Sequence, residues 1–137
     1  MPDATIPADV RTLLDERIHT LEQLEAIILV RKGEREDWSG EEVADLLHIS
    51  IESANEALQR LAQAGVLEAI ELPGHVVRYR GFTKRFEALV DRLLEVYESN
   101  RIELMMLLSA NAIERMRTGA LRAFADAFVV GRKRKDG

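Results

Sequence analysis

The sequence has 137 residues, of which 47% are apolar and 31% are charged, and it contains no cysteine. This composition predicts one globular domain with an appended element and excludes a disordered chain, a disulfide framework and any thiolate metal site. No apolar run reaches the roughly 18 residues needed to span a membrane, and the first ten residues lack a signal pattern, so we expect a cytoplasmic protein without membrane contact.

Charge is distributed unevenly along the chain, whose formal net charge is −5. Residues 38–82 carry seven acidic and three basic side chains, whereas residues 83–137 carry eight acidic and eleven basic ones. Lys and Arg side chains that neutralise phosphates supply most non-specific affinity for DNA. The acidic middle of the chain is therefore evidence against strong DNA binding by that part alone.

Two helices are expected first. In residues 6–18 the apolar side chains recur at helical spacing. Thr20, with Gln23 three residues later, has the arrangement of an N-cap for a second helix, and Gly33 follows that helix. Residues 33–38 are polar and are expected to form a loop.

Residues 39–65 have the pattern of a helix-turn-helix. Ser39 and Glu42 form a capping box for the first short helix, in which Leu46 is expected on the buried side. Ser50 caps the second helix, and Gly65 ends it. The connection of three to four residues matches the geometry of the motif.

A β-hairpin is expected directly after the second helix. Residues 66–71 and 76–80 are β-compatible, and Pro73-Gly74 supplies the turn between them. A hairpin in this place forms a wing, which we assign to residues 66–82.

The chain returns to helix from Thr83, with interruptions expected at Ser109 and Gly119. An apolar series with steps of four and three resembles a coiled-coil seam, and an Asn in such a series is a known determinant of register. We expect this series to form the core of a homodimer. The alternative is that the additional apolar side chains of this helix pack on the first helices of its own chain, and both arrangements can hold at once. The series consists of Phe86, Val90, Leu93, Tyr97, Asn100, Leu104 and Leu108.

The segment SGEEVADLLHISIESANEALQRLAQAGVLE, followed by a hairpin that ends in VVRYRGF, resembles winged-helix bacterial transcriptional regulators of the MarR-like and ArsR-like kind. The matching positions are Ser50, Ser53, Leu58, Leu61, Gly65 and Val66. The resemblance implies a mainly α fold, a winged helix-turn-helix with a short β-hairpin wing and additional N- and C-terminal helices. Residues 1–82 would hold the first helices and the winged-helix core, and residues 83–137 a C-terminal helical extension for dimerisation.

In such regulators the second helix enters the major groove of double-stranded DNA and the wing contacts the backbone or minor groove. Carried over by position, the implied DNA-binding residues are Ser53, Asn55, Gln59, Arg60, His75, Arg78, Arg80, Lys84 and Arg85. Glu52 and Glu56 depart from this role because carboxylates repel phosphates. Both are explained structurally by the helix dipole and by a pair between Glu56 and Arg60.

A protein-interaction module is therefore kept as the alternative function, with the acidic second helix docking a basic or apolar protein partner. The basic run at residues 132–135 would add phosphate contacts, bind an acidic partner or form a solvated end. The three histidines lie in different elements without metal-ligand spacing, and no phosphate loop or nucleophile motif is present. We expect no metal, no cofactor and no catalytic residues, and hence no enzyme activity.

Overall fold

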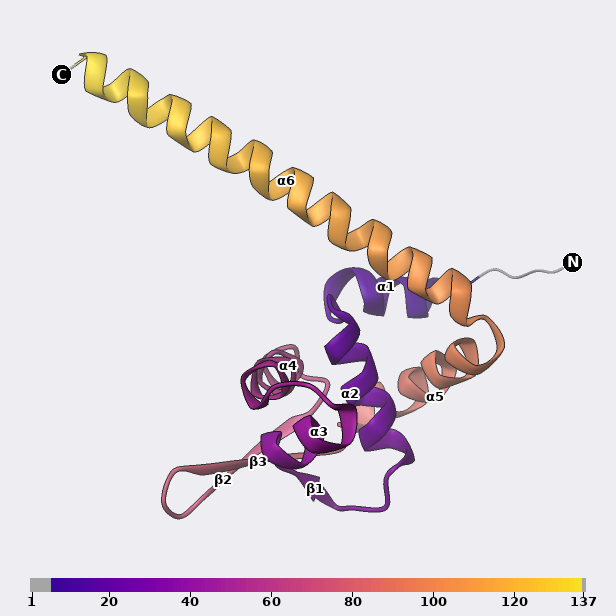
Figure 1. Ribbon diagram of the computed structural model, residues 1–137. Helices are drawn as coiled ribbons and strands as arrows, with labels where there is room; N and C mark the ends of the chain where they lie inside the picture. The colour runs from indigo at the N-terminus through magenta and orange to yellow at the C-terminus, as the bar shows by residue number, and fades with distance from the viewer. Residues whose placement is uncertain (1–5, 137) are drawn as a thin grey trace, which may run out of the picture.

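The fold is seen in a computed structural model that describes residues 6–136, and the side chains of residues 6–127. It is mainly helical, with a small antiparallel sheet. The elements in chain order are α1 (Ala8–Glu16), α2 (Leu21–Lys32), β1 (Asp37–Trp38), α3 (Gly40–Leu47), α4 (Ile51–Gln63), β2 (Glu68–Leu72), β3 (Val76–Arg80), α5 (Lys84–Ser99) and α6 (Arg101–Asp136). Helices α2, α3 and α4 and the sheet form one body, and α6 runs across α1 and projects beyond it (Figure 1). Among the described helices, none combines the length and apolar character that a membrane span requires.

The predicted helix caps are confirmed. The Ser39 hydroxyl accepts a hydrogen bond from the Glu42 amide at 3.1 Å, and the Glu42 carboxylate accepts one from the Ser39 amide at 2.8 Å. The Ser50 hydroxyl accepts from the Ser53 amide at 3.0 Å, and Thr20 caps α2 in the same way. Each such cap stabilises its helix by about 1 kcal/mol, so local sequence fixes where α2, α3 and α4 begin.

The helix-turn-helix consists of α3 and α4. His48 turns the chain between them in the left-handed conformation, with φ of 57°. The inner face of α4 is buried against the core, as its spacing predicts; it comprises Ala54, Ala57, Leu58 and Leu61. One expectation about α3 is wrong, because Leu46 is 49% exposed.

The sheet has the strand order β1-β3-β2, with both pairs antiparallel. The hairpin of β2 and β3 is the predicted wing, with Gly74 in its turn at φ of 81°. The expectation that residues 33–38 form only a loop is wrong, because β1 pairs with β3 and places Trp38 opposite Tyr79. Both rings are buried, and this burial holds a two-residue strand that is too short to show any periodicity.

The C-terminal helices differ most from expectation. α6 continues through Ser109 and Gly119 without a break, and the chain turns instead at Asn100, with φ of −146° and ψ of 45°. Ser and Gly inside a helix cost at most about 1 kcal/mol each, which a 36-residue helix tolerates. The turn at Asn100 folds α6 back onto α5 (Figure 1).

The predicted dimerisation series lies in the core of a single chain. Its residues pack against α1, α2 and one another, so the packing within one chain that the sequence left open is present. Phe86, Val90, Leu93, Leu104 and Leu108 are buried, Tyr97 is half-buried against them, and Asn100 stands at the turn. A homodimer would therefore need another surface.

Candidate nucleic-acid interface

The outward face of α4 is polar and uncovered. Ser53, Asn55 and Gln59 are exposed, and the helix lies on the side of the body from which the wing projects (Figure 1). The side-chain amide of Asn55 lies close to Gly40 at the start of α3, as a Cβ placed on Gly40 would stand only 1.8 Å from Asn55 Oδ1. α4 thus presents hydrogen-bonding side chains beside a protruding hairpin.

Arg60 is paired on its own helix, as the sequence predicts for Glu56 and Arg60. Its Nε atom lies 3.3 Å from Glu56 Oε1, and both side chains are more than 60% exposed. Such a pair stabilises a helix by only about 0.3–0.5 kcal/mol. The guanidinium of Arg60 is therefore free to exchange its partner for a phosphate.

Arg78 is held by two carboxylates. Its Nε atom donates to Asp37 Oδ1 at 2.5 Å, and its Nη2 atom donates to Glu42 Oε1 at 2.7 Å. The Asp37 carboxylate raises the pKa of Arg78 above its ordinary value. The hydrogen bond from the Ser39 amide is the main cause of the lowered pKa of Glu42, and Arg78 lowers this pKa further, against the opposing effect of burial. Arg78 therefore fastens β3 to β1 and α3, and it is the least available of the predicted phosphate contacts.

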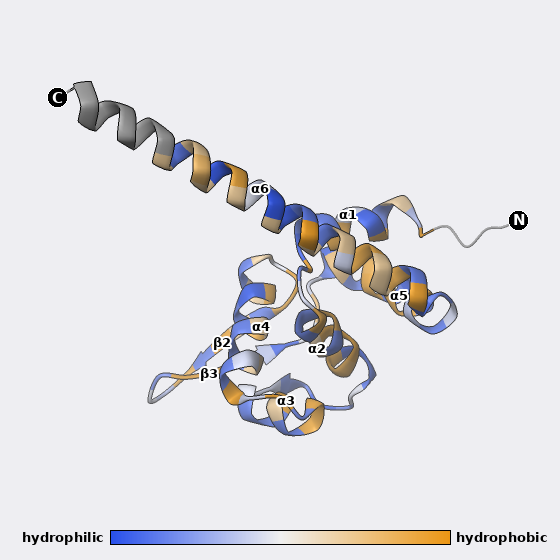
Figure 2. Cartoon of the chain, turned by 45° about the horizontal axis from the view of Figure 1, so that its top comes forward, coloured by the Kyte–Doolittle hydropathy of each residue, from blue (hydrophilic) through white to orange (hydrophobic). Residues whose placement is uncertain are grey.

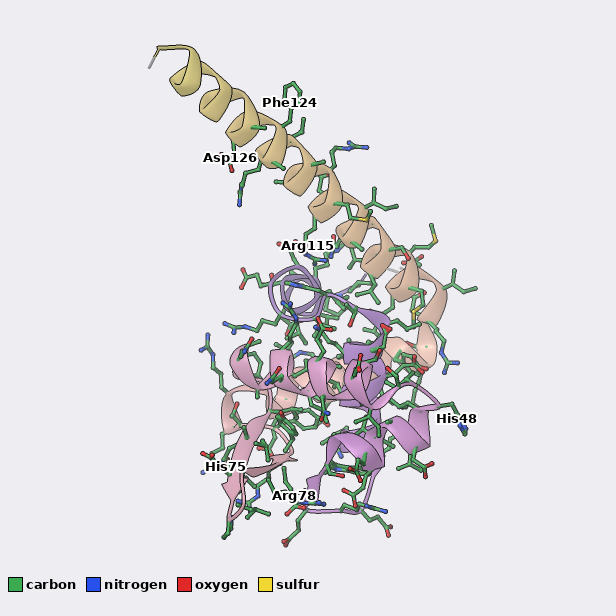
Figure 3. All side chains as sticks on the ribbon, turned by 60° about the vertical axis from the view of Figure 1, so that its left-hand side comes forward. His48, His75, Arg78, Arg115, Phe124 and Asp126 are labelled. Atoms are coloured by element: carbon green, nitrogen blue, oxygen red, sulfur yellow. The ribbon has the colours of Figure 1, made fainter. Side chains whose placement is uncertain are left out.

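The other two wing residues lie apart from each other. His75 is at the tip, with a side chain that is 98% exposed and lies 4.0 Å from Glu71. Arg80 lines a hollow of about 650 Å³ together with Arg31 and Arg35. The residues around this hollow come from α2, the segment between α2 and β1, the end of β3 with the two residues after it, and α5. Figure 3 shows His75 and Arg78 along the hairpin and His48 well away from both. No residue of α4 lines the Arg80 hollow.

Lys84 and Arg85 lie next to the C-terminal end of α4. Both are exposed, and the hydroxyl of the preceding Thr83 donates to the Gly65 carbonyl at 3.2 Å. Arg17 donates to the Ala64 carbonyl at the same place. With Arg60 in the last turn of α4, these residues give that end of the helix a positive surface.

The opposite end of α4 is acidic and apolar. Ile51 in the first turn of α4 is 52% exposed, and Leu46 in the last turn of α3 is 49% exposed. The same two turns carry the exposed carboxylates of Asp45 and Glu52. A hollow of about 340 Å³ opens at the turn between these helices. Helical spacing alone did not reveal this patch, since it assigned Leu46 to the core.

The predicted DNA-binding residues thus form no single basic stripe. Ser53, Asn55, Gln59 and Arg60 share α4, Lys84 and Arg85 adjoin its end, and Arg78 and Arg80 lie elsewhere. The basic run at residues 132–135 lies outside the residues whose side chains are described. Within the described range, no cluster of three His, Asp or Glu side chains is arranged to hold a metal.

No family model matches the chain, and no curated protein matches it. The chain is similar in structure to a mutant of ZitR from Lactococcus lactis, with a TM-score of 0.42 and 14% identity over 93% of this chain and 79% of that one. A likeness this weak carries no conclusion about function.

Proposed function

We propose that this protein is a winged-helix transcription-regulator-like protein that binds double-stranded DNA as a homodimer, with contacts mainly to phosphates. The observation that carries the proposal is the uncovered polar face of α4 beside the protruding wing. A helix in this position fits the major groove. Asn and Gln side chains pair with adenine edges in that groove, and Asn55 and Gln59 provide such side chains on α4.

The charges around α4 set how the DNA is approached. Glu52 in its first turn repels phosphates, whereas Arg60, Lys84 and Arg85 attract them at its other end. Three phosphate contacts per subunit are six in the dimer, and they correspond to a slope of log K against log salt of about −5.4, at about −0.9 for each contact. We therefore expect modest affinity that falls steeply with salt.

The test is a titration of a fluorescent duplex at several salt concentrations, read by anisotropy. Lys84→Ala/Arg85→Ala should weaken binding and flatten the salt dependence. The matched control, Arg31→Ala/Arg92→Ala, removes the same charge from arginines that are paired with Asp91 and Asp9 away from α4, and it should keep the wild-type slope. Absence of salt-dependent binding by the wild type at low salt would overturn the proposal.

A protein-interaction module is the second candidate, favoured by the acidic and apolar patch at the turn between α3 and α4. Exposed Leu46 and Ile51 amid carboxylates suit a basic amphipathic helix. A synthetic amphipathic peptide of Lys and Leu, titrated in the same way, should bind the wild type and lose affinity on Leu46→Glu if this function is correct. Equal binding by both proteins would exclude this patch as its site.

A further inference from the structure

A row of exposed side chains runs along α6 on the face that turns away from its own body. Its spacing repeats in steps of four and three, through Ile102, Met106, Ser109, Ile113, Met116 and Ala120, all of them exposed. The four large members are between 59% and 77% exposed. Figure 2 shows hydrophobic segments recurring along the part of α6 that projects past α1.

The opposite face of α6 holds the helix to its own chain. Leu104 and Leu108 are buried, and the guanidinium of Arg115 donates to the carbonyls of Leu14 and Asp15 at 3.4 Å (Figure 3). At 100° per residue these side chains lie nearly opposite the exposed row. Beyond Arg115, every residue from 116 to 127 is exposed.

An uncovered helix of this kind requires a partner. Isolated helices are marginally stable in water and gain most of their stability from packing of an apolar face. An apolar row of heptad spacing fits another helix of the same spacing, since each side chain inserts between four of the facing helix. The row therefore matches its own copy on a second chain.

We propose that two copies of this chain pair through α6 against α6, antiparallel and centred near Asn111. The proposal deepens the homodimer part of the proposed function and does not depend on DNA binding. In this register Met106 of one copy faces Met116 of the other, and Ile113 faces Ser109. The two helices then overlap over about 20 residues, or roughly 30 Å, and residues 116–120 of each copy cover residues 102–106 of the other.

Charge decides the orientation. In the antiparallel register Glu103 of one copy lies beside Arg117 of the other, and this opposite-charge pair occurs twice. Arg117 is 68% exposed and lies 4.0 Å from Glu114 of its own helix, so it can exchange this exposed partner for the contact. In a parallel pair the flanking position opposite Arg117 is Ala112, and no opposite charges meet.

The first test is sedimentation equilibrium of the full chain without DNA. The wild type should be a dimer at micromolar concentration, and Met106→Glu/Ile113→Glu should raise the dissociation constant at least 100-fold. Both positions are exposed in one chain, so circular dichroism should show the fold retained. Ala125→Glu, exposed on the opposite face and beyond the overlap, is the matched control and should stay dimeric. A monomeric wild type, or a dimer indifferent to the double variant, overturns the pairing.

The second test fixes the orientation. Glu103→Arg and Arg117→Glu should each weaken the dimer about tenfold, because each change removes two opposite-charge pairs and puts like charges in their place. The two changes together should restore affinity to within about threefold of the wild type. Failure of this rescue overturns the antiparallel register. The DNA titrations above are read independently, so loss of DNA binding leaves the result for α6 unaffected.

Discussion

Arg78 and Lys84 offer a matched pair of substitutions that distinguishes a structural cation from one available to DNA. Each change to alanine removes one positive charge, so the change in overall charge is the same. Arg78 is already bonded to Asp37 and Glu42 at 2.5 and 2.7 Å, whereas Lys84 has no ion pair among the described side chains and is exposed. We therefore expect Lys84→Ala, and not Arg78→Ala, to remove a phosphate contact.

The expected magnitude follows from counterion release. One phosphate contact adds about 0.9 to the slope of log K against log salt. A residue that contacts one phosphate in each subunit of the dimer accounts for two such contacts, and thus for roughly a 12-fold loss of affinity between about 50 and 200 mM salt. The loss measured for Lys84→Ala over this range should thus be about 12-fold smaller than the loss measured for Arg78→Ala or the wild type.

The assay is fluorescence anisotropy with one duplex at four or more salt concentrations, after circular dichroism has shown that each variant is folded. Equal slopes for Arg78→Ala and the wild type, with a reduced slope for Lys84→Ala, are the predicted result. A slope reduced as much by Arg78→Ala as by Lys84→Ala would refute the assignment of Arg78 to structure.

Three further predictions concern the fold itself. The pKa of Glu42 is lowered, first by the hydrogen bond from the backbone amide of Ser39. The ionised carboxylate therefore stabilises the fold above the unfolded-state pKa of Glu42, and this contribution is lost as pH falls through the lower folded-state pKa. In Glu42→Gln the free energy of unfolding should fall less steeply as pH is lowered in the acidic range. Leu104→Ala should lower the free energy of unfolding in urea by about 2–5 kcal/mol, whereas Leu121→Ala, at a side chain 64% exposed, should change it by less than about 0.5 kcal/mol. Gly33→Ala should lower the free energy of unfolding by about 1–3 kcal/mol, because the new Cβ would lie 2.3 Å from the ring of Trp38. Gly119→Ala is the matched control: its Cβ would meet nothing within 4 Å, and the change should stabilise α6 by up to about 1 kcal/mol.

Local signals predicted the winged-helix part of the fold well. The capping box of Ser39 and Glu42, the Ser50 cap and the turn at Gly74 each depend on residues a few positions apart, so the sequence contains all the information that they need. The strand from Val76 to Arg80 has the predicted bounds. Local chemistry thus fixed α3, α4 and the wing.

Features that depend on distant contacts were not predictable. β1 exists because Trp38 packs opposite Tyr79, more than 40 residues away. Arg78 is withdrawn from the candidate site by Asp37 and Glu42, which lie on different elements. In both cases spacing along the chain carries no signal of the partner.

Helical spacing alone does not show which of two apolar faces in the C-terminal region packs on the body of the chain. Two heptad-like series follow Thr83, and the one that includes Leu93 and Leu104 faces the core of its own chain. The second series, with Ile102 and Ile113, is the exposed one. Periodicity shows that a helix has an apolar face, but which face meets the body depends on the turn at Asn100.

Hydrogen exchange with and without a DNA duplex at low salt is the most direct test of the claim that α4 and the surface beside its C-terminal end contact DNA. We predict slower exchange in peptides that cover α4 and residues 83–88, and little change in residues 101–127 of α6. Protection confined to residues 128–137, or no protection anywhere, would contradict the claim.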